Sequence, residues 1–164
     1  MSDKIEIRTI KHEDNYALAK LVRDTLIEFK ANKPGTAFYD DSTDHLYETF
    51  QAGKSKYFVV LINNEIAGGA GIYPTNGLPS DTCELVKIYL LPDTRGKGIG
   101  KKLMQYCFDE AKKQGFKKIY LETMPELKTA IPMYEKFGFN YLDHPMGCSG
   151  HTGCSIWMLK DLEL

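Results

Sequence analysis

The residues best suited to chemistry form a glycine-rich, basic stretch just past the middle of the chain. It reads "RGKGIGKK" over 95–102, with glycines at alternate positions and four basic residues within eight. An apolar run precedes it and a segment with helical spacing follows it. A helix that begins after glycines presents unpaired N–H groups and the positive end of its dipole, so the stretch favours phosphate binding. The alternative is a flexible surface turn with solvated lysines.

Two common nucleotide-binding fingerprints do not fit this stretch. The mononucleotide loop requires serine or threonine after its lysine, whereas Lys101 is followed by Lys102. The dinucleotide fingerprint requires glycine at position 101 and a place early in the fold. The sequence therefore points to a phosphate-bearing ligand held in another way.

A second group of chemically capable residues lies near the C-terminus. His144, Cys148, His151 and Cys154 are ligand types that zinc accepts. Structural zinc sites usually pair ligands from two separate knuckles, whereas these four lie in one glycine-rich connection. We expect no metal here and interpret the segment as a loop between the last two strands.

Composition limits the class of protein that must position these residues. The chain has 164 residues, 43% of them hydrophobic, and a formal charge of −1, which predicts one globular domain spanning 1–164. The basic cluster is local, so we expect no nucleic-acid partner. The first ten residues lack the apolar core of a signal peptide, and no window resembles a membrane span. We therefore expect a cytoplasmic protein without membrane association, whose four cysteines are reduced.

Hydrophobic periodicity predicts an alternation of strands and helices. Asn63 and Asn64 tolerate the positive φ of a tight turn between two antiparallel strands. Helical spacing predicts helices over 18–29, 43–51, 99–115 and 130–137. Alternation predicts strands over 4–10, 56–62, 65–73, 83–91, 117–123, 139–142 and 154–162. These elements predict an α/β domain with a strand, glycine loop, helix and strand at its centre.

Two motifs together resemble the GNAT superfamily of acetyl-CoA-dependent N-acetyltransferases. The first is the R-x-x-G-x-G sequence over 95–100, and the second is "AIPMYEKFGF" over 130–139, with a tyrosine on the last helix. The resemblance covers roughly 84–139. It implies a mixed, mostly antiparallel central sheet flanked by helices, in a single GNAT-like domain.

The resemblance also implies which residues bind acetyl-CoA, the co-substrate. Main-chain groups of Ile88 and Leu90 would pair with the pantetheine arm as if it were an added strand. The backbone of the glycine loop would hold the diphosphate, through Arg95, Gly96, Lys97, Gly98, Ile99, Gly100 and Lys101. In place of an asparagine that many relatives use as a further contact, this chain has Leu127.

The same resemblance assigns the catalytic roles. Tyr134 would donate a proton to the departing thiolate, and Glu84 is the candidate base that frees the attacking amine. The alternatives are a core aromatic for Tyr134 and an exposed carboxylate at a strand end for Glu84. Pro132 is compatible with a helix only in its first turn, so the helix that carries Tyr134 should begin near position 128 or 129.

The acceptor is the least determined part of the prediction. A C-terminal loop overhanging the acceptor site would make Phe38, Tyr39 and His151 pocket residues, and ordinary loop positions are the alternative. The near-neutral charge favours a small-molecule primary amine over a basic protein tail. A protein or peptide N-acetyltransferase and a catalytically silent acyl-CoA-binding module are the other hypotheses. A homodimer is compatible with the sequence.

Overall fold

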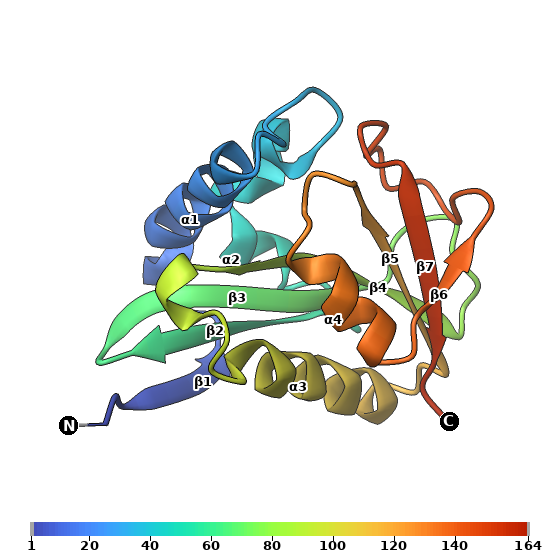
Figure 1. The fold of residues 1–164 in the computed structure, drawn as a ribbon. Helices are drawn as coiled ribbons and strands as arrows, with labels where there is room; N and C mark the ends of the chain where they lie inside the picture. The colour runs from blue at the N-terminus through green and yellow to red at the C-terminus, as the bar shows by residue number, and fades with distance from the viewer. Residues whose placement is uncertain (1, 164) are drawn as a thin grey trace.

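One mixed sheet organises residues 2–163, which the computed structural model describes (Figure 1). Its strand order is β1-β2-β3-β4-β5-β7-β6, and every pair of neighbours is antiparallel except β4 and β5. The strands are β1 (Ile5–Thr9), β2 (Lys56–Ile62), β3 (Glu65–Tyr73), β4 (Thr82–Leu90), β5 (Lys118–Thr123), β6 (Asn140–Leu142) and β7 (Ile156–Asp161). The predicted fold class, an α/β domain with a mostly antiparallel mixed sheet, is confirmed.

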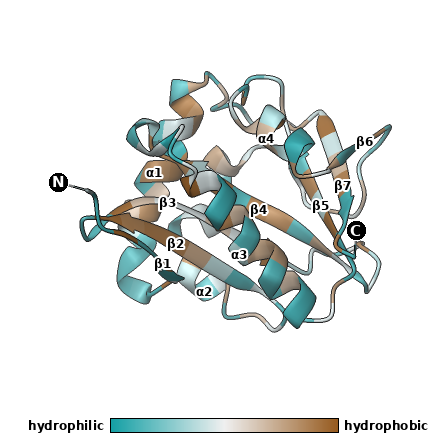
Figure 2. Cartoon of the chain, turned by 60° about the horizontal axis from the view of Figure 1, so that its bottom comes forward, coloured by the Kyte–Doolittle hydropathy of each residue, from teal (hydrophilic) through white to brown (hydrophobic). Residues whose placement is uncertain are grey.

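Helices cover both faces of this sheet. Helices α1 (Asn15–Glu28) and α2 (Leu46–Thr49) lie on one face, and α3 (Ile99–Lys113) lies on the other (Figure 1). Helix α4 (Ala130–Lys136) follows β5 and begins two residues before Pro132, so the proline falls in the first turn as predicted. The apolar side of α3 and the brown lengths of β2 and β4 meet in the core, whereas teal residues line the outer side of α3 (Figure 2).

The predicted hairpin between β2 and β3 is confirmed. Asn63 and Asn64 have φ values of 52° and 70°, which is the left-handed conformation that asparagine tolerates better than most residues. The helix predicted over 99–115 is confirmed as α3, and its residues at helical spacing, Ile99, Leu103, Cys107 and Ala111, form a buried stripe.

The helix predicted over 43–51 is shorter than its pattern. A 3-10 turn occupies Asp41–Asp44, and α2 itself covers only Leu46–Thr49. The buried hydroxyl of Thr43 donates to the carbonyl of Ala37 at 2.6 Å, and His45 leaves the helical conformation, with φ −134° and ψ 45°. This tertiary hydrogen bond and the break at His45 divide the predicted single helix into a 3-10 turn and a short α-helix.

Strand β4 contains a β-bulge that was not predicted from the sequence. Gly69 pairs with Tyr89 and Gly71 pairs with Val86, so Lys87 and Ile88 both lie opposite the one residue between the glycines. Lys87 has a φ of 54°. Because an L-residue with a Cβ disfavours this region by about 1 kcal/mol, its surroundings must hold it there.

The bulge reverses which side chains of β4 face which side of the sheet. Leu85 packs in the core beneath α3, and Val86 packs on the α1 and α2 side. Strict alternation would return position 88 to the α1 side, but Ile88 and Leu90 pack against the α3 core instead. After the bulge, the even-numbered residues of β4 face the α3 side of the sheet, whereas before it they face the α1 side.

Strands β4 and β5 separate soon after they begin. They pair only from Thr82 to Glu84 on β4 and from Lys118 to Tyr120 on β5. Figure 1 shows β5, β7 and β6 diverging from β4, with α4 beside the opening. Although β4 is a central strand, its second half has no partner on the β5 side. Its backbone groups there are free to pair with a ligand, as at the edge of a sheet.

None of the helices in residues 2–163 combines the length and the hydrophobicity needed to cross a membrane.

Candidate active site

A cavity of about 650 Å³ lies along the free edge of β4. Ile88 and Leu90 line it from the strand, Leu127 lines it from the segment before α4, and Tyr134 lines it from α4 itself. The glycine loop closes its far end through Arg95, Gly96, Gly98, Gly100 and Lys101. The structure therefore gathers most of the predicted cofactor residues around one elongated space.

The glycine loop is shaped to leave backbone exposed. Gly96 and Gly98 have φ values of 78° and 76°, a region in which glycine is unstrained. A Cβ added at either residue would meet no atom within 4 Å, so both face open space. Helix α3 begins directly after Gly98, and no side chain caps it. Its first N–H groups and the positive end of its dipole thus remain available to an anion.

The side chain of Arg95 supports the loop from behind. Its guanidinium binds the carboxylate of Glu28 at 2.6 and 3.0 Å and donates to the carbonyl of Leu90 at 2.8 Å. It also lies over the ring of Phe29, which directly follows α1. The Leu90 carbonyl keeps a second lone pair for a ligand. Arg95 would therefore contribute its backbone to the predicted site, while its side chain joins the loop to α1 and β4.

The remaining loop residues differ in where their side chains go. Ile99 is 1% exposed and belongs to the core, so it could serve a ligand only through its main chain. Lys97 is exposed, with its Nζ 3.9 Å from Asp3. Lys101 lines the cavity together with Lys136 of α4. These two lysines add positive charge at the glycine end of the cavity.

Tyr134 lines the same cavity from α4. It is 4% exposed, and its ring packs against Phe139 at a centroid distance of 5.9 Å. Burial, followed by the nearby thiol of Cys154, raises the pKa of Tyr134 well above its ordinary value. The phenol therefore keeps its proton at physiological pH, which a general acid requires.

A second cavity, of about 330 Å³, opens at the start of β4. Glu84 lines it and is 3% exposed, so it is not an exposed carboxylate at a strand end. The hydroxyl of Thr75 donates to Glu84 Oε1 at 2.6 Å. Burial raises the pKa of Glu84 to about 7, against the lowering effect of Thr75. A carboxylate with this pKa can accept a proton near neutral pH.

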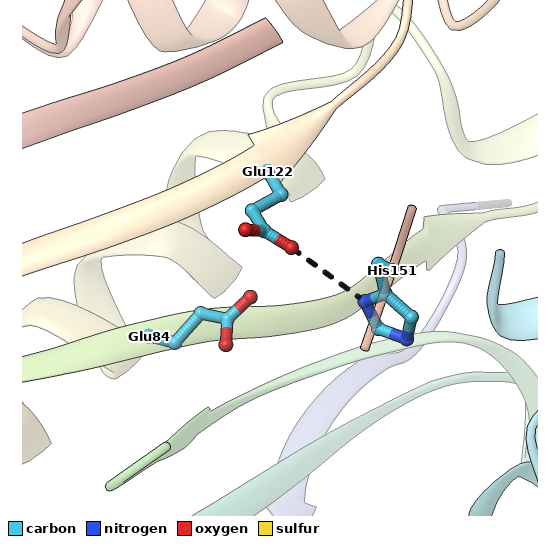
Figure 3. Close-up of side chains that lie close together, drawn as sticks. All are labelled: Glu84, Glu122 and His151. Atoms are coloured by element: carbon cyan, nitrogen blue, oxygen red, sulfur yellow. Dashed lines mark ion pairs between the residues drawn. The ribbon is translucent and has the colours of Figure 1, made fainter. Parts of the chain in front are cut away.

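Glu122 on β5 faces Glu84 and was not among the predicted residues (Figure 3). Its carboxylate accepts hydrogen bonds from the hydroxyls of Tyr120, at 2.6 Å, and Ser149. The charge of Glu122 contributes to the raised pKa of Glu84. The sequence signal was weak, because a glutamate at the end of a strand is common. Only the parallel pairing of β4 and β5 places it here.

His151 brings the C-terminal loop to these two carboxylates. Its Nδ1 lies 3.9 Å from Glu122 Oε1, and Figure 3 shows the ring directed toward the two glutamates. Within residues 2–163, Glu84, Glu122 and His151 form the one group of three that could hold a metal ion. Of the zinc-type series His144, Cys148, His151 and Cys154, His151 alone joins this group.

Asp40 completes the wall of the second cavity. It binds His151 Nε2 at 2.6 Å and Lys87 Nζ at 2.8 Å. Burial alone would raise the pKa of Asp40, but the hydrogen bond with His151 and the charge of Lys87 lower it to about 2. Phe38 and Tyr39 precede this residue and line neither cavity: Phe38 packs near α1, and Tyr39 is 60% exposed. Their acceptor role stays a prediction.

The thiol of Cys154 interacts electrostatically with Tyr134 of the first cavity and Glu84 of the second. Burial, then the charges of Glu122 and Glu84, raises the pKa of its thiol to about 12, and the same thiol acts on Tyr134. The arrangement therefore pairs a protonated phenol with a carboxylate that titrates near neutrality, on the two sides of one opening in the sheet. In such a pair the carboxylate can accept a proton from one reactant, and the phenol can donate a proton to the other.

Comparison with known proteins gives a consistent picture. The family model described as "Acetyltransferase (GNAT) family" matches residues 18–139. The uncharacterized N-acetyltransferase YjgM of Escherichia coli K12 is 41% identical over 158 residues, covering 95% of this chain and 94% of that protein.

Solved structures share the whole fold. A GNAT-family acetyltransferase from Staphylococcus aureus Mu50 has a TM-score of 0.86 at 19% identity and covers 97% of this chain and 99% of its own. The putative acetyltransferase YncA of Salmonella typhimurium, solved with acetyl-CoA, has a TM-score of 0.76 at 20% identity and covers 97% and 94%.

Proposed function

Because the chain belongs to the GNAT family of acetyl-CoA-dependent N-acetyltransferases, we propose that it moves the acetyl group of acetyl-CoA to the primary amine of a small molecule. The observation that carries this proposal is the pair of cavities that meet at β4, one containing Tyr134 and the glycine loop, the other containing Glu84. The second cavity, at about 330 Å³, is lined by the carboxylates of Asp40 and Glu84 and suits a small amine.

The first cavity fits coenzyme A. The open space around Gly96 and Gly98 leaves room for a diphosphate against the backbone, and the uncapped start of α3 supplies N–H groups. The free edge of β4 offers main-chain groups of Ile88 and Leu90 to the amides of the pantetheine arm. An acetyl thioester at the end of that arm would then lie near Tyr134.

Glu84 prepares the acceptor for reaction. A protonated amine has no free electron pair, so it must lose a proton before it can attack. Glu84 takes that proton, directly or through water, because its pKa of about 7 leaves a large fraction ionised at neutral pH. The negative charge of Asp40, whose pKa is lowered to about 2, favours a cationic acceptor in the same cavity.

Transfer then requires one proton at the leaving group. The neutral amine nitrogen forms a bond to the acetyl carbonyl carbon, and the bond from that carbon to sulfur breaks. The sulfur leaves with the electron pair of that bond, and Tyr134 supplies the proton that makes it a thiol. The proton that the nitrogen loses as it becomes an amide restores the phenol of Tyr134, directly or through water. The products are an N-acetylated amine and free coenzyme A.

The proposal is tested by incubating the protein with acetyl-CoA and a panel of small amines, basic peptides and a no-acceptor control. We expect free thiol to appear only with small amines, in step with an acetylated product seen by mass spectrometry. Transfer to peptides alone would replace the small-molecule acceptor with a protein one. Tight binding of coenzyme A with no transfer to any acceptor would favour a silent acyl-CoA module.

A further inference from the structure

Tyr57 of β2 reaches across β3 to the bulge of β4. Its ring is wholly buried, and its hydroxyl donates a hydrogen bond to the main-chain carbonyl of Lys87 at 2.8 Å. Strand β3 lies between β2 and β4, so this bond joins strands that are not neighbours in the sheet. No backbone ladder makes such a connection.

Two glycines of β3 make room for this contact. A Cβ at Gly69 would lie 2.6 Å from Tyr57 Cε1 and 2.7 Å from its hydroxyl oxygen. A Cβ at Gly71 would lie 2.7 Å from Tyr57 Cδ2. Phe50 packs against the ring at a centroid distance of 5.0 Å. Gly69 and Gly71 thus leave space on one face of β3 that the ring of Tyr57 fills.

The carbonyl that Tyr57 holds belongs to the strained residue of the bulge. Lys87 has a φ of 54° although it is not glycine, which is the residue usually found at a left-handed bulge position. A non-glycine residue keeps this conformation only where its surroundings fix it. The hydroxyl of Tyr57 fixes its carbonyl, and Asp40 binds its ammonium group at 2.8 Å.

We propose that Tyr57 is a positioning residue for acetyl transfer: by holding the Lys87 carbonyl it maintains the bulge that turns Ile88 and Leu90 toward the cofactor cavity. The inference rests on the proposed function, because it concerns the cofactor half of that site. Before the bulge, β4 presents Glu84 to the acceptor; after it, the same strand presents its free edge to the pantetheine arm. Tyr57 acts at the junction and touches neither ligand.

The test compares Tyr57→Phe with Ser55→Ala. Each variant removes one buried hydroxyl that donates to a main-chain carbonyl, and Ser55, which bonds to Ala52 at 2.5 Å, lines neither cavity. We expect Tyr57→Phe to weaken coenzyme A binding about fivefold to thirtyfold by calorimetry, as a buried carbonyl without its donor would. Amide exchange over 87–90 should also become faster. Ser55→Ala should change neither, and both variants should show the wild-type circular dichroism spectrum.

A second variant tests whether the effect passes through the bulge. Glycine adopts a positive φ without strain, so Lys87→Gly should make the bulge less dependent on Tyr57. In the Lys87→Gly background, adding Tyr57→Phe should change coenzyme A affinity about twofold or less. The proposal is overturned if Tyr57→Phe weakens coenzyme A binding fivefold to thirtyfold in the Lys87→Gly background as well. It is also overturned if folded Tyr57→Phe alone binds coenzyme A with wild-type affinity.

These measurements separate the positioning role from the proposed function. Affinity and amide exchange require no acceptor, so they can support the role of Tyr57 even if no amine is acetylated. Conversely, wild-type turnover with unchanged affinity in Tyr57→Phe would leave the enzyme intact and remove Tyr57 from its mechanism.

Discussion

The imidazole Nε2 of His151 lies 2.6 Å from Oδ2 of Asp40 and joins two loops whose residues are 111 positions apart. The same loops touch through main chain where Gly153 N donates to the carbonyl of Gly35 at 2.9 Å. A Cβ at Gly35 would lie 2.5 Å from Gly153 N, so the approach requires glycine there. The wall of the second cavity is therefore fixed by a contact between distant segments.

This contact predicts an acid-sensitive contribution to stability. The folded pKa of Asp40 is lowered to about 2 from 3.8, so its ionised form stabilises the fold above pH 4 and that contribution is lost as the pH falls toward 2. Asp40→Asn should lower the free energy of unfolding by about 2 kcal/mol near pH 7. Urea unfolding of the wild type and Asp40→Asn between pH 3 and 7 should show the difference between their free energies of unfolding becoming smaller at the acid end. A difference in the free energy of unfolding that does not change with pH would contradict the stabilising role of ionised Asp40.

Glu84→Gln should remove a titration from the pH profile of kcat/KM. The wild-type profile should rise through about pH 7 as Glu84 ionises. The deficit of the variant, about 10² to 10⁴, should be greatest between pH 7 and the pKa of the amine, and shrink above it because the amine is then neutral. Stopped assays of thiol release across this range would check it.

Glu122→Gln is the matched control for that experiment. It keeps the base but removes the neighbouring charge that helps to raise the pKa of Glu84. Its inflection should therefore move to lower pH and remain visible. An inflection that disappears in Glu122→Gln and survives in Glu84→Gln would reverse the two roles.

Tyr134→Phe should separate binding from catalysis. The ring and its packing on Phe139 remain, so acetyl-CoA affinity should stay close to that of the wild type. Turnover should fall about 10² to 10⁴, which is typical of a lost general acid. Tyr141→Phe, at an exposed position on β6, is the control and should leave both unchanged. Wild-type turnover in Tyr134→Phe, where chemistry limits the rate, would show that the thiolate leaves without this proton.

Gly98→Asp should weaken coenzyme A binding by placing strain and negative charge at the expected phosphate site. Gly115→Asp, just past the other end of α3, is matched because both glycines have positive φ and face open space. Each should lose about 1 to 2 kcal/mol of stability from backbone strain. Calorimetry should show reduced affinity for coenzyme A in Gly98→Asp alone. Equal affinities in the two variants would place the diphosphate elsewhere.

The elements of this fold were largely readable from the sequence because most follow simple periodicity. The β2–β3 hairpin, the α3 stripe and the start of α4 all came from local patterns. The bulge at Lys87 was not readable, because "CELVKIYLL" alternates acceptably as one continuous strand, and the hydroxyl that binds the Lys87 carbonyl comes from Tyr57, thirty residues earlier. Local pattern carries no information on a hydrogen bond across an intervening strand.

The candidate site was readable only where a motif marks it. The glycine loop and Tyr134 came from motifs, and the structure places them on one cavity. Glu122 and Asp40 were missed because each acquires its neighbours through tertiary structure: the parallel register of β4 with β5 for one, and the approach of two loops for the other. Phe38 and Tyr39 were chosen in the right loop, but Asp40 is the residue that reaches the cavity wall.

The divergence of β4 from β5 also has a kinetic consequence. Because the two cavities meet at β4 and share no lining residue, the two reactants can be bound together in one ternary complex. Direct transfer within such a complex needs no acetylated enzyme between two half-reactions. Initial-rate plots against one substrate at several fixed concentrations of the other should then give lines that intersect, whereas parallel lines would indicate that coenzyme A departs before the amine arrives.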